Sequence, residues 1–178
     1  DQAERVEVTA LSALTQLAEG TPAEADVQFL SWATRLHEIG ISIAHNAYHK
    51  HGAYILTFAD MPGFSKKDQA RLAMLVLGHR GKLEKLGMVA AVDSAWRLIF
   101  CLRLAVLLHR TRDDRALPAW RATATARGFQ LDLPAEWPRV LHELGALLSQ
   151  DAPPPVRAAI EALASASPAQ LHALAEQV

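Results

Sequence analysis

Apolar residues recur at spacings of three and four along the first 80 positions, which is the period of an amphipathic helix. Gly20 ends the first of these segments and suits a helix C-terminus, and the sequence from Thr21 to Glu24 has the form of a capping box for the second. Ser65 has the character of an N-cap for the fourth. The predicted helices cover residues 3–19, 21–40, about 47–59 and 65–79, with residues 41–46 as a short connection.

The pattern changes in the second half of the chain. Residues 92–112 are apolar nearly all round, which predicts a helix at the centre of a bundle. Residues 120–133 alternate between apolar and polar on both sides of Arg127-Gly128, which predicts a β-hairpin. We therefore predict a mainly α fold, with an HD-like helical bundle over residues 1–115 and a small C-terminal appendage over 116–178 that contains the hairpin. Short helices are also predicted within the appendage, at residues 140–148, 156–164 and 168–177.

Composition fits a globular protein, with 51% hydrophobic and 21% charged residues. Because Arg103 interrupts the longest apolar run, residues 98–108, no contact with a membrane is predicted. The single cysteine, Cys101, lies in this run and is predicted to be a buried, inert thiol. Without a set of cysteines for disulfides, the expected location is the cytoplasm.

Charge is distributed unevenly along the chain. Residues 35–112 carry twelve Lys and Arg against five Asp and Glu, whereas residues 1–34 carry one basic residue against six acidic ones. Five of the eight histidines lie between residues 37 and 79, within this positive segment. Two readings fit this segregation, a chance mixture of solvated helix faces and a surface that binds anions.

Histidines mark the predicted helix ends. His37 and Glu38 end the second helix, His51 lies near the start of the third, and His79 ends the fourth. This arrangement resembles the HD superfamily, whose metal ions bind phosphate between helices, although Glu38 stands where that superfamily has aspartate. The alternative reading is that each histidine packs in the core or caps a helix by bonding to the backbone.

Two other positions argue against a working metal centre. The resemblance places Gln2 where the superfamily has its first histidine, and Val106 where it has its last aspartate. Because valine cannot coordinate a metal, His37, Glu38 and His79 are only weak metal candidates, and we predict no metal for this chain. Basic residues are instead predicted to contact phosphate. The candidate phosphate-binding residues are Lys50, His51, His79, Arg80, Lys82 and Arg103, the last either paired with a buried partner such as Glu38 or open to a polar channel.

Five phrases, in order, resemble the C-terminal part of the exopolyphosphatase/guanosine pentaphosphate phosphohydrolase family. They are Leu36-His-Glu-Ile-Gly, Tyr48-His-Lys-His-Gly-Ala-Tyr-Ile-Leu, Asp60-Met-Pro-Gly-Phe-Ser, Leu77-Gly-His-Arg and Arg103-Leu-Ala-Val-Leu-Leu. The resemblance covers residues 1–133. It implies that hydrolysis belongs to two N-terminal actin-like domains, with Mg²⁺ as cofactor of the full-length enzyme, and that the present domain lines a channel for long polyphosphate and is often dimeric.

The predicted function is therefore a binding and dimerisation domain without catalytic residues of its own. The expected partners are inorganic polyphosphate, the actin-like domains of the parent enzyme and a second copy of the chain. Nucleic acid is not predicted, because no recognition motif is present. One alternative is an autonomous HD-type nucleotide phosphohydrolase with a metal at His37, Glu38 and His79. Another is a regulatory domain whose basic residues pair with the protein itself. The sequence leaves open whether polyphosphate or guanosine pentaphosphate is preferred.

Overall fold

The protein is described from a computed structural model that defines residues 1–81, 86, 94–110, 112, 117, 119–125 and 128–132. The chain divides into two compact units, Asp1–Asp113 and Asp114–Val178. Lys82 and the helices predicted beyond residue 133 lie outside the described residues.

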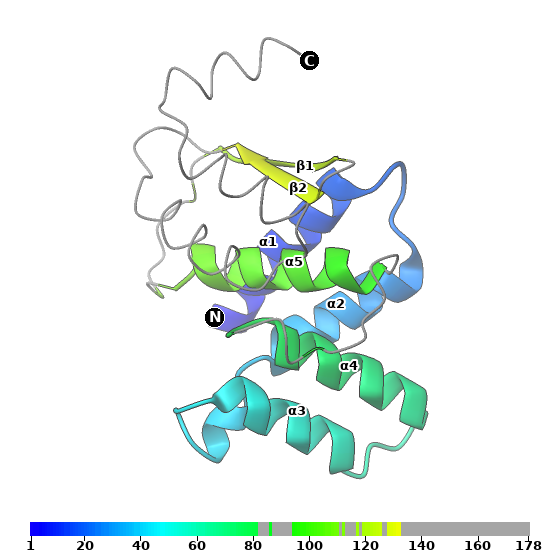
Figure 1. Cartoon of the computed structure of the whole chain (residues 1–178), viewed down its shortest axis with the longest axis vertical. Helices are drawn as coiled ribbons and strands as arrows, with labels where there is room; N and C mark the ends of the chain where they lie inside the picture. The colour runs from blue at the N-terminus through cyan, green and yellow to red at the C-terminus, as the bar shows by residue number, and fades with distance from the viewer. Residues whose placement is uncertain are drawn as a thin grey trace. The chain divides into compact units, whose positions relative to one another are not determined.

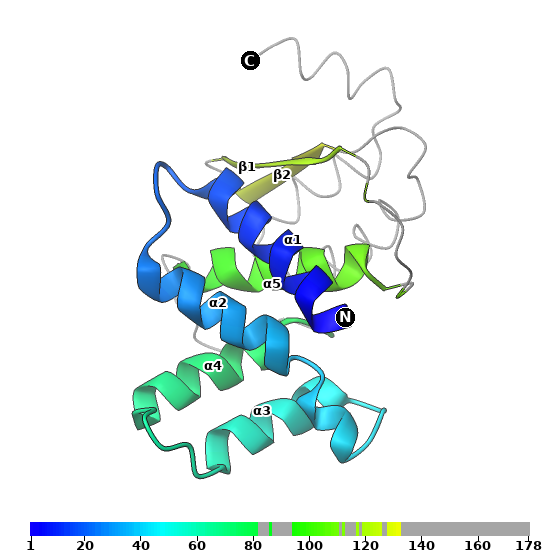
Figure 2. The same ribbon diagram turned by 180° about the vertical axis from the view of Figure 1, so that it is seen from behind.

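The first unit is a bundle of helices (Figure 1). Helix α1 packs on α2 and α5, α2 also contacts α4 and α5, and α3 packs on α4 and on the short 3₁₀ helix η1. The two opposite views agree that α5 and α3 lie on opposite sides of this stack (Figure 2). The predicted mainly α fold is confirmed. The elements are α1 (Gln2–Leu17), α2 (Glu24–Leu36), η1 (Ile39–Ser42), α3 (Tyr48–Phe58), α4 (Lys66–Gly78) and α5 (Ser94–Leu108).

Leucines and small apolar residues form the core of this unit, and α5 contributes the largest share. Its burial on nearly all sides agrees with the apolar pattern of its sequence. Burial raises the pKa of the Cys101 thiol to about 12, so this cysteine is inert as predicted. Fully buried side chains include Leu14, Leu30, Leu56, Leu72, Leu75, Leu98 and Leu102.

Two predicted helix starts differ in outcome. Ser65 caps α4 as expected, and its hydroxyl and the Asp68 carboxylate form a reciprocal capping box. The capping box predicted at Thr21 is wrong, because α2 begins only at Glu24 and its N-cap, Ala23, has no side-chain hydrogen bond. The carboxylates of Glu24 and Asp26 in the first turn stabilise this end through the helix dipole instead.

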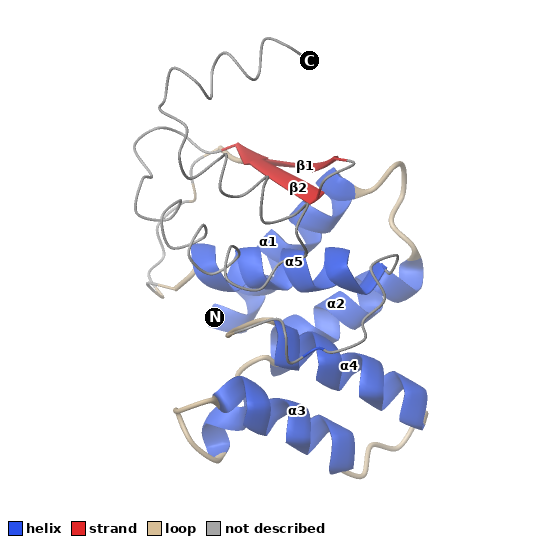
Figure 3. Cartoon of the chain, in the orientation of Figure 1, coloured by secondary structure: helices blue, strands red, loops and turns tan. Residues whose placement is uncertain are grey.

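The second unit contains a two-stranded antiparallel sheet, which confirms the predicted hairpin (Figure 3). Strand β1 (Arg121–Thr125) pairs with β2 (Gly128–Asp132). The register places Ala122 opposite Leu131 and Ala124 opposite Phe129, so the two apolar cross-strand pairs lie on one face, and the first of them is buried.

Among the helices that the structure describes, none combines the length and the apolar character needed to cross a bilayer.

Candidate functional site

Two of the predicted site histidines cap the C-termini of helices. His37 follows the last residue of α2, with its Nδ1 atom 2.6 Å from the Thr34 carbonyl oxygen, and His79 follows α4, with Nδ1 2.6 Å from the Val76 carbonyl oxygen. A carbonyl only accepts hydrogen bonds, so Nδ1 donates in both rings. Each neutral imidazole therefore keeps its lone pair on Nε2. Capping by these side chains satisfies carbonyls that the helix ends leave without a helical partner.

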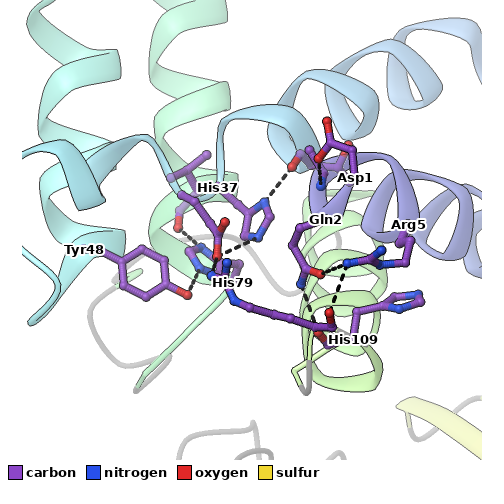
Figure 4. A network of polar contacts seen from close by, with 12 residues as sticks. Asp1, Gln2, Arg5, His37, Tyr48, His79 and His109 are labelled. Carbon is purple, nitrogen blue, oxygen red and sulfur yellow. Dashed lines mark hydrogen bonds and ion pairs between the residues drawn. The ribbon is translucent and has the colours of Figure 1, made fainter. Parts of the chain in front are cut away.

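The two rings belong to a buried group of four, here called the ring cluster: His37, Tyr48, His49 and His79. The ring centroids of His37 and His79 lie 5.4 Å apart in an edge-on arrangement. The rings of Tyr48 and His49 lie 5.4 Å and 6.2 Å from that of His79. The Tyr48 hydroxyl donates to Nε2 of His79 at 3.4 Å (Figure 4). The cluster thus joins the C-termini of α2 and α4 to the N-terminus of α3.

His49, which the sequence interpretation did not select, occupies the place expected for His51. Residues two positions apart on a helix point about 200° apart, so only one of His49 and His51 can face the core. His51 is partly exposed, and among the described residues it makes no ring contact with the cluster. The signal that identifies His49 is its spacing from Ala53 and Leu56, which lie on the same buried face.

The side chains at the junction do not fit a divalent metal ion. Nε2 of His37 lies 3.9 Å from Oε1 of Glu38, but the Glu38 carboxylate forms an ion pair with Arg112. Among the described residues, no three or more His, Cys, Asp or Glu side chains are arranged as metal ligands.

Gln2, which stands where the HD resemblance has a histidine, has a structural contact instead. Its amide nitrogen donates to the His109 carbonyl oxygen at 2.9 Å, and its amide oxygen accepts from Arg5 at 3.1 Å (Figure 4). The His109 ring in turn bonds the Thr9 hydroxyl at 2.8 Å. These contacts tie the start of α1 to the end of α5.

Arg103 is buried in α5, with only 7% of its surface exposed. Nη1 donates to the Gly78 carbonyl oxygen at 2.8 Å, and Nη2 donates to the Gly81 carbonyl oxygen at 2.9 Å. The partner suggested from sequence, Glu38, pairs with Arg112 in the described part of the chain. Arg103 therefore fixes the turn that follows α4, and a direct contact between its guanidinium and phosphate stays a prediction.

That turn carries Arg80, which is exposed. Its guanidinium carbon lies 5.2 Å from the centre of the Tyr48 ring, within the range of a cation–π contact. Lys50 is also exposed, in the first turn of α3. The structure thus places two predicted phosphate ligands on the elements that meet at the ring cluster, and one of them lies directly over a cluster ring.

Comparison with known proteins identifies the domain. Residues 1–152 match the family model described as Ppx/GppA phosphatase, domain III. The chain belongs to this family. The match agrees with the resemblance read from the sequence and extends beyond residue 133, where that resemblance was expected to end.

Two curated relatives of this domain III share one name. A protein of Pseudoalteromonas translucida named guanosine-5'-triphosphate,3'-diphosphate pyrophosphatase is 34% identical over 142 residues, which cover 76% of this chain and 28% of the relative. A protein of the same name from Aeromonas hydrophila is 35% identical over 143 residues, covering 77% of this chain and 29% of the relative. The chain thus spans less than a third of the length of these relatives.

Burial also makes this domain III sensitive to acid. Burial lowers the pKa of His37, against the opposing effects of the Thr34 carbonyl and the Glu38 carboxylate, and lowers the pKa of His79 well below its ordinary value. Unfolding exposes both rings, so the unfolded chain binds protons that the folded chain does not.

We expect the free energy of unfolding to fall as the pH drops below about 6.5, the ordinary pKa of histidine, and to keep falling towards the lowered folded-state values. Urea denaturation at a series of pH values between about 7.5 and 5 measures this slope. The neutral variant His79→Gln should have a shallower slope than the parent. Equal slopes for His79→Gln and the parent would show that His79 does not cause the pH dependence of stability.

Proposed function

We propose that this domain III is a non-catalytic module that binds the phosphate chain of the substrate of a Ppx/GppA phosphatase. The supporting observation is the placement of Arg80. It lies on a turn whose Gly81 carbonyl accepts a hydrogen bond from the buried Arg103, and the Arg80 guanidinium lies over the Tyr48 ring. A guanidinium on an anchored turn loses little conformational freedom when it binds phosphate, and it matches phosphate geometry well. Lys50, His51 and, by sequence, Lys82 are the other residues that we propose to contact phosphate, and His79 is buried against Tyr48.

Electrostatics supports a polyanionic ligand. The excess of seven positive charges falls within residues 35–112, the segment that also contains the ring cluster. A linear phosphate chain carries about one charge per phosphate, and a basic surface binds such a chain by displacing its condensed counterions. Arg103 meets one expectation of the regulatory hypothesis, because its guanidinium bonds to the protein's own backbone. Arg80 also contacts the protein, through the Tyr48 ring, while its side chain stays exposed, and Lys50 is exposed as well.

Hydrolysis would then be performed by another part of the parent enzyme. From the resemblance we propose N-terminal actin-like domains with Mg²⁺ for that role, and a homodimer as the assembled form. The names of the curated relatives favour guanosine pentaphosphate as one substrate, and inorganic polyphosphate is the other. Both ligands present the same chemistry, a run of phosphoanhydride-linked phosphates.

The proposal is tested by titrating the 178-residue chain with inorganic polyphosphate and, separately, with guanosine pentaphosphate at several salt concentrations. We expect the logarithm of the affinity to fall linearly with the logarithm of the salt concentration. Phosphate release, followed on the same samples with and without Mg²⁺ or Mn²⁺, should stay at background.

Affinity that does not change with salt, or no binding of either ligand, would refute the binding role. Metal-dependent phosphate release that disappears in Glu38→Ala would support the autonomous HD-type phosphohydrolase instead. The relative affinity for the two ligands decides which substrate this domain prefers.

A further inference from the structure

The buried His37 ring has one polar atom that makes no hydrogen bond. Its Nδ1 atom donates to the Thr34 carbonyl, so the lone pair lies on Nε2, and burial lowers the pKa of the ring, which keeps it neutral. Nε2 is shielded from solvent and has no hydrogen-bond partner among the residues that the structure describes. A buried acceptor without a donor costs free energy, so this nitrogen favours a ligand that brings a donor.

The polar group beside Nε2 is a carboxylate, which cannot supply that donor. Oε1 of Glu38 lies 3.9 Å from Nε2 of His37, and the same oxygen accepts from the Arg112 guanidinium. A carboxylate oxygen and the lone pair of a neutral imidazole are both acceptors, so Glu38 satisfies Arg112 and leaves His37 unsatisfied. The Glu38 oxygen therefore occupies a position between a cation and a hydrogen-bond acceptor.

Arg112 is anchored on its side of this position. Its backbone amide donates to the His109 carbonyl at 3.1 Å, and its own carbonyl accepts from Arg5 at 3.4 Å. Its φ angle of 55° is the left-handed conformation, which residues other than glycine seldom adopt. Residues held in such conformations cluster at functional sites, and an anchored guanidinium loses little conformational freedom when it binds phosphate.

We propose that Arg112 and His37 bind the terminal phosphate of a phosphate chain, and that Glu38 occupies this site until the phosphate displaces it. The inference rests on the proposed phosphate-binding function and adds to it the residues that receive the chain end. A terminal phosphate loses its last proton near pH 6, whereas phosphates inside a chain have no such proton. Its anionic oxygens pair with the guanidinium of Arg112, and its P–OH group donates to Nε2 of His37.

Glu38 can leave the site at small cost. Its side chain is 27% exposed and that of Arg112 is 53% exposed, and ion pairs at such positions contribute little to stability. A phosphate carries more negative charge than a carboxylate and also offers two oxygens to one guanidinium, so it competes effectively for Arg112. The displaced carboxylate turns to solvent. Glu38 thus restricts the site to ligands that bind Arg112 more tightly than a carboxylate does.

The test is titration of the full chain at neutral pH with linear triphosphate, which has chain ends, and with cyclic trimetaphosphate, which has none. Arg112→Ala should weaken the binding of linear triphosphate about tenfold, because it removes a charge-assisted contact, and should change the binding of the cyclic probe little. Lys67→Ala is the matched control, because it removes one exposed positive charge from the first turn of α4. It should bind both probes like the parent.

Glu38→Ala tests the competition. Removing the carboxylate should strengthen the binding of linear triphosphate about two- to fivefold, the range expected for a partly exposed ion pair. The gain should vanish in the double variant with Arg112→Ala, since it acts through Arg112. Asp60→Ala controls for the loss of one negative charge, because Asp60 is exposed and follows the C-terminus of α3. It should leave the affinity unchanged. Circular dichroism checks that each variant is folded.

Equal affinity of Arg112→Ala and the parent for linear triphosphate would overturn the proposal. Equal losses for the linear and cyclic probes would also overturn it, as would a gain from Glu38→Ala that persists without Arg112. Guanosine pentaphosphate is titrated against the same variants, and the ligand that loses more affinity in Arg112→Ala is the source of the terminal phosphate. Weaker polyphosphate binding by Arg80→Ala, together with unchanged binding by Arg112→Ala, would refute this site and leave the proposed function intact.

Discussion

Replacing Gly40 by alanine is expected to destabilise the helical unit by about 3 kcal/mol or more. A Cβ atom at this position would lie 1.9 Å from the Tyr48 carbonyl oxygen and 2.4 Å from the Gly52 amide nitrogen. Both neighbours are backbone atoms of α3, so relief requires η1 and α3 to move apart. Urea or thermal denaturation of Gly40→Ala measures the loss.

Gly52→Ala is the matched control for this prediction. Its Cβ atom would meet a side-chain methyl group of Val76 at 3.0 Å, which a small shift can relieve. Alanine is also favoured over glycine within a helix by about 1 kcal/mol, which offsets part of the crowding. We therefore expect Gly52→Ala to lie within about 1 kcal/mol of the parent. Equal losses for the two variants would show that η1 does not approach α3 as closely as described.

Arg103→Ala is expected to cost about 2–4 kcal/mol of folding stability. The change removes two charge-assisted hydrogen bonds, leaves the Gly78 and Gly81 carbonyls without these donors, and removes the packing of a long side chain in the core. Arg103→Lys keeps the charge but has one side-chain nitrogen in place of the two that bond the carbonyls, so its loss of folding stability should be smaller than that of Arg103→Ala. The denaturation midpoints of the two variants show which is less stable. An Arg103→Ala variant as stable as the parent would contradict the role of this residue at the end of α4.

The helices were predictable because the signals that mark a helix lie in residues close together in the sequence. The period of apolar residues places α1 to α5, and the serine and aspartate of the α4 capping box lie three residues apart. Even so, the local motif at Thr21, which makes Pro22 the first helical residue, does not start the helix, because α2 begins two residues later, at Glu24.

The site was predictable only in part, because its contacts join residues far apart in the sequence. His37 and His79 were found through their positions at helix ends, yet choosing between His49 and His51 requires knowing which face of α3 is buried. The partners of Arg103 are backbone carbonyls more than twenty residues away, which side-chain patterns do not reveal. The requirement for glycine at position 40 likewise depends on where η1 crosses α3.

The most direct test of phosphate binding is to compare the polyphosphate affinity of Arg80→Ala with that of Lys67→Ala, measured by titration on folded protein. Both residues are exposed and carry one positive charge, but only Arg80 lies on the turn held by Arg103, whereas Lys67 lies in the first turn of α4. The account predicts a loss of about 1–2 kcal/mol, with a reduction of the salt slope by about one, for Arg80→Ala and almost no change for Lys67→Ala. Equal affinities and equal salt slopes for both variants and the parent chain would contradict it.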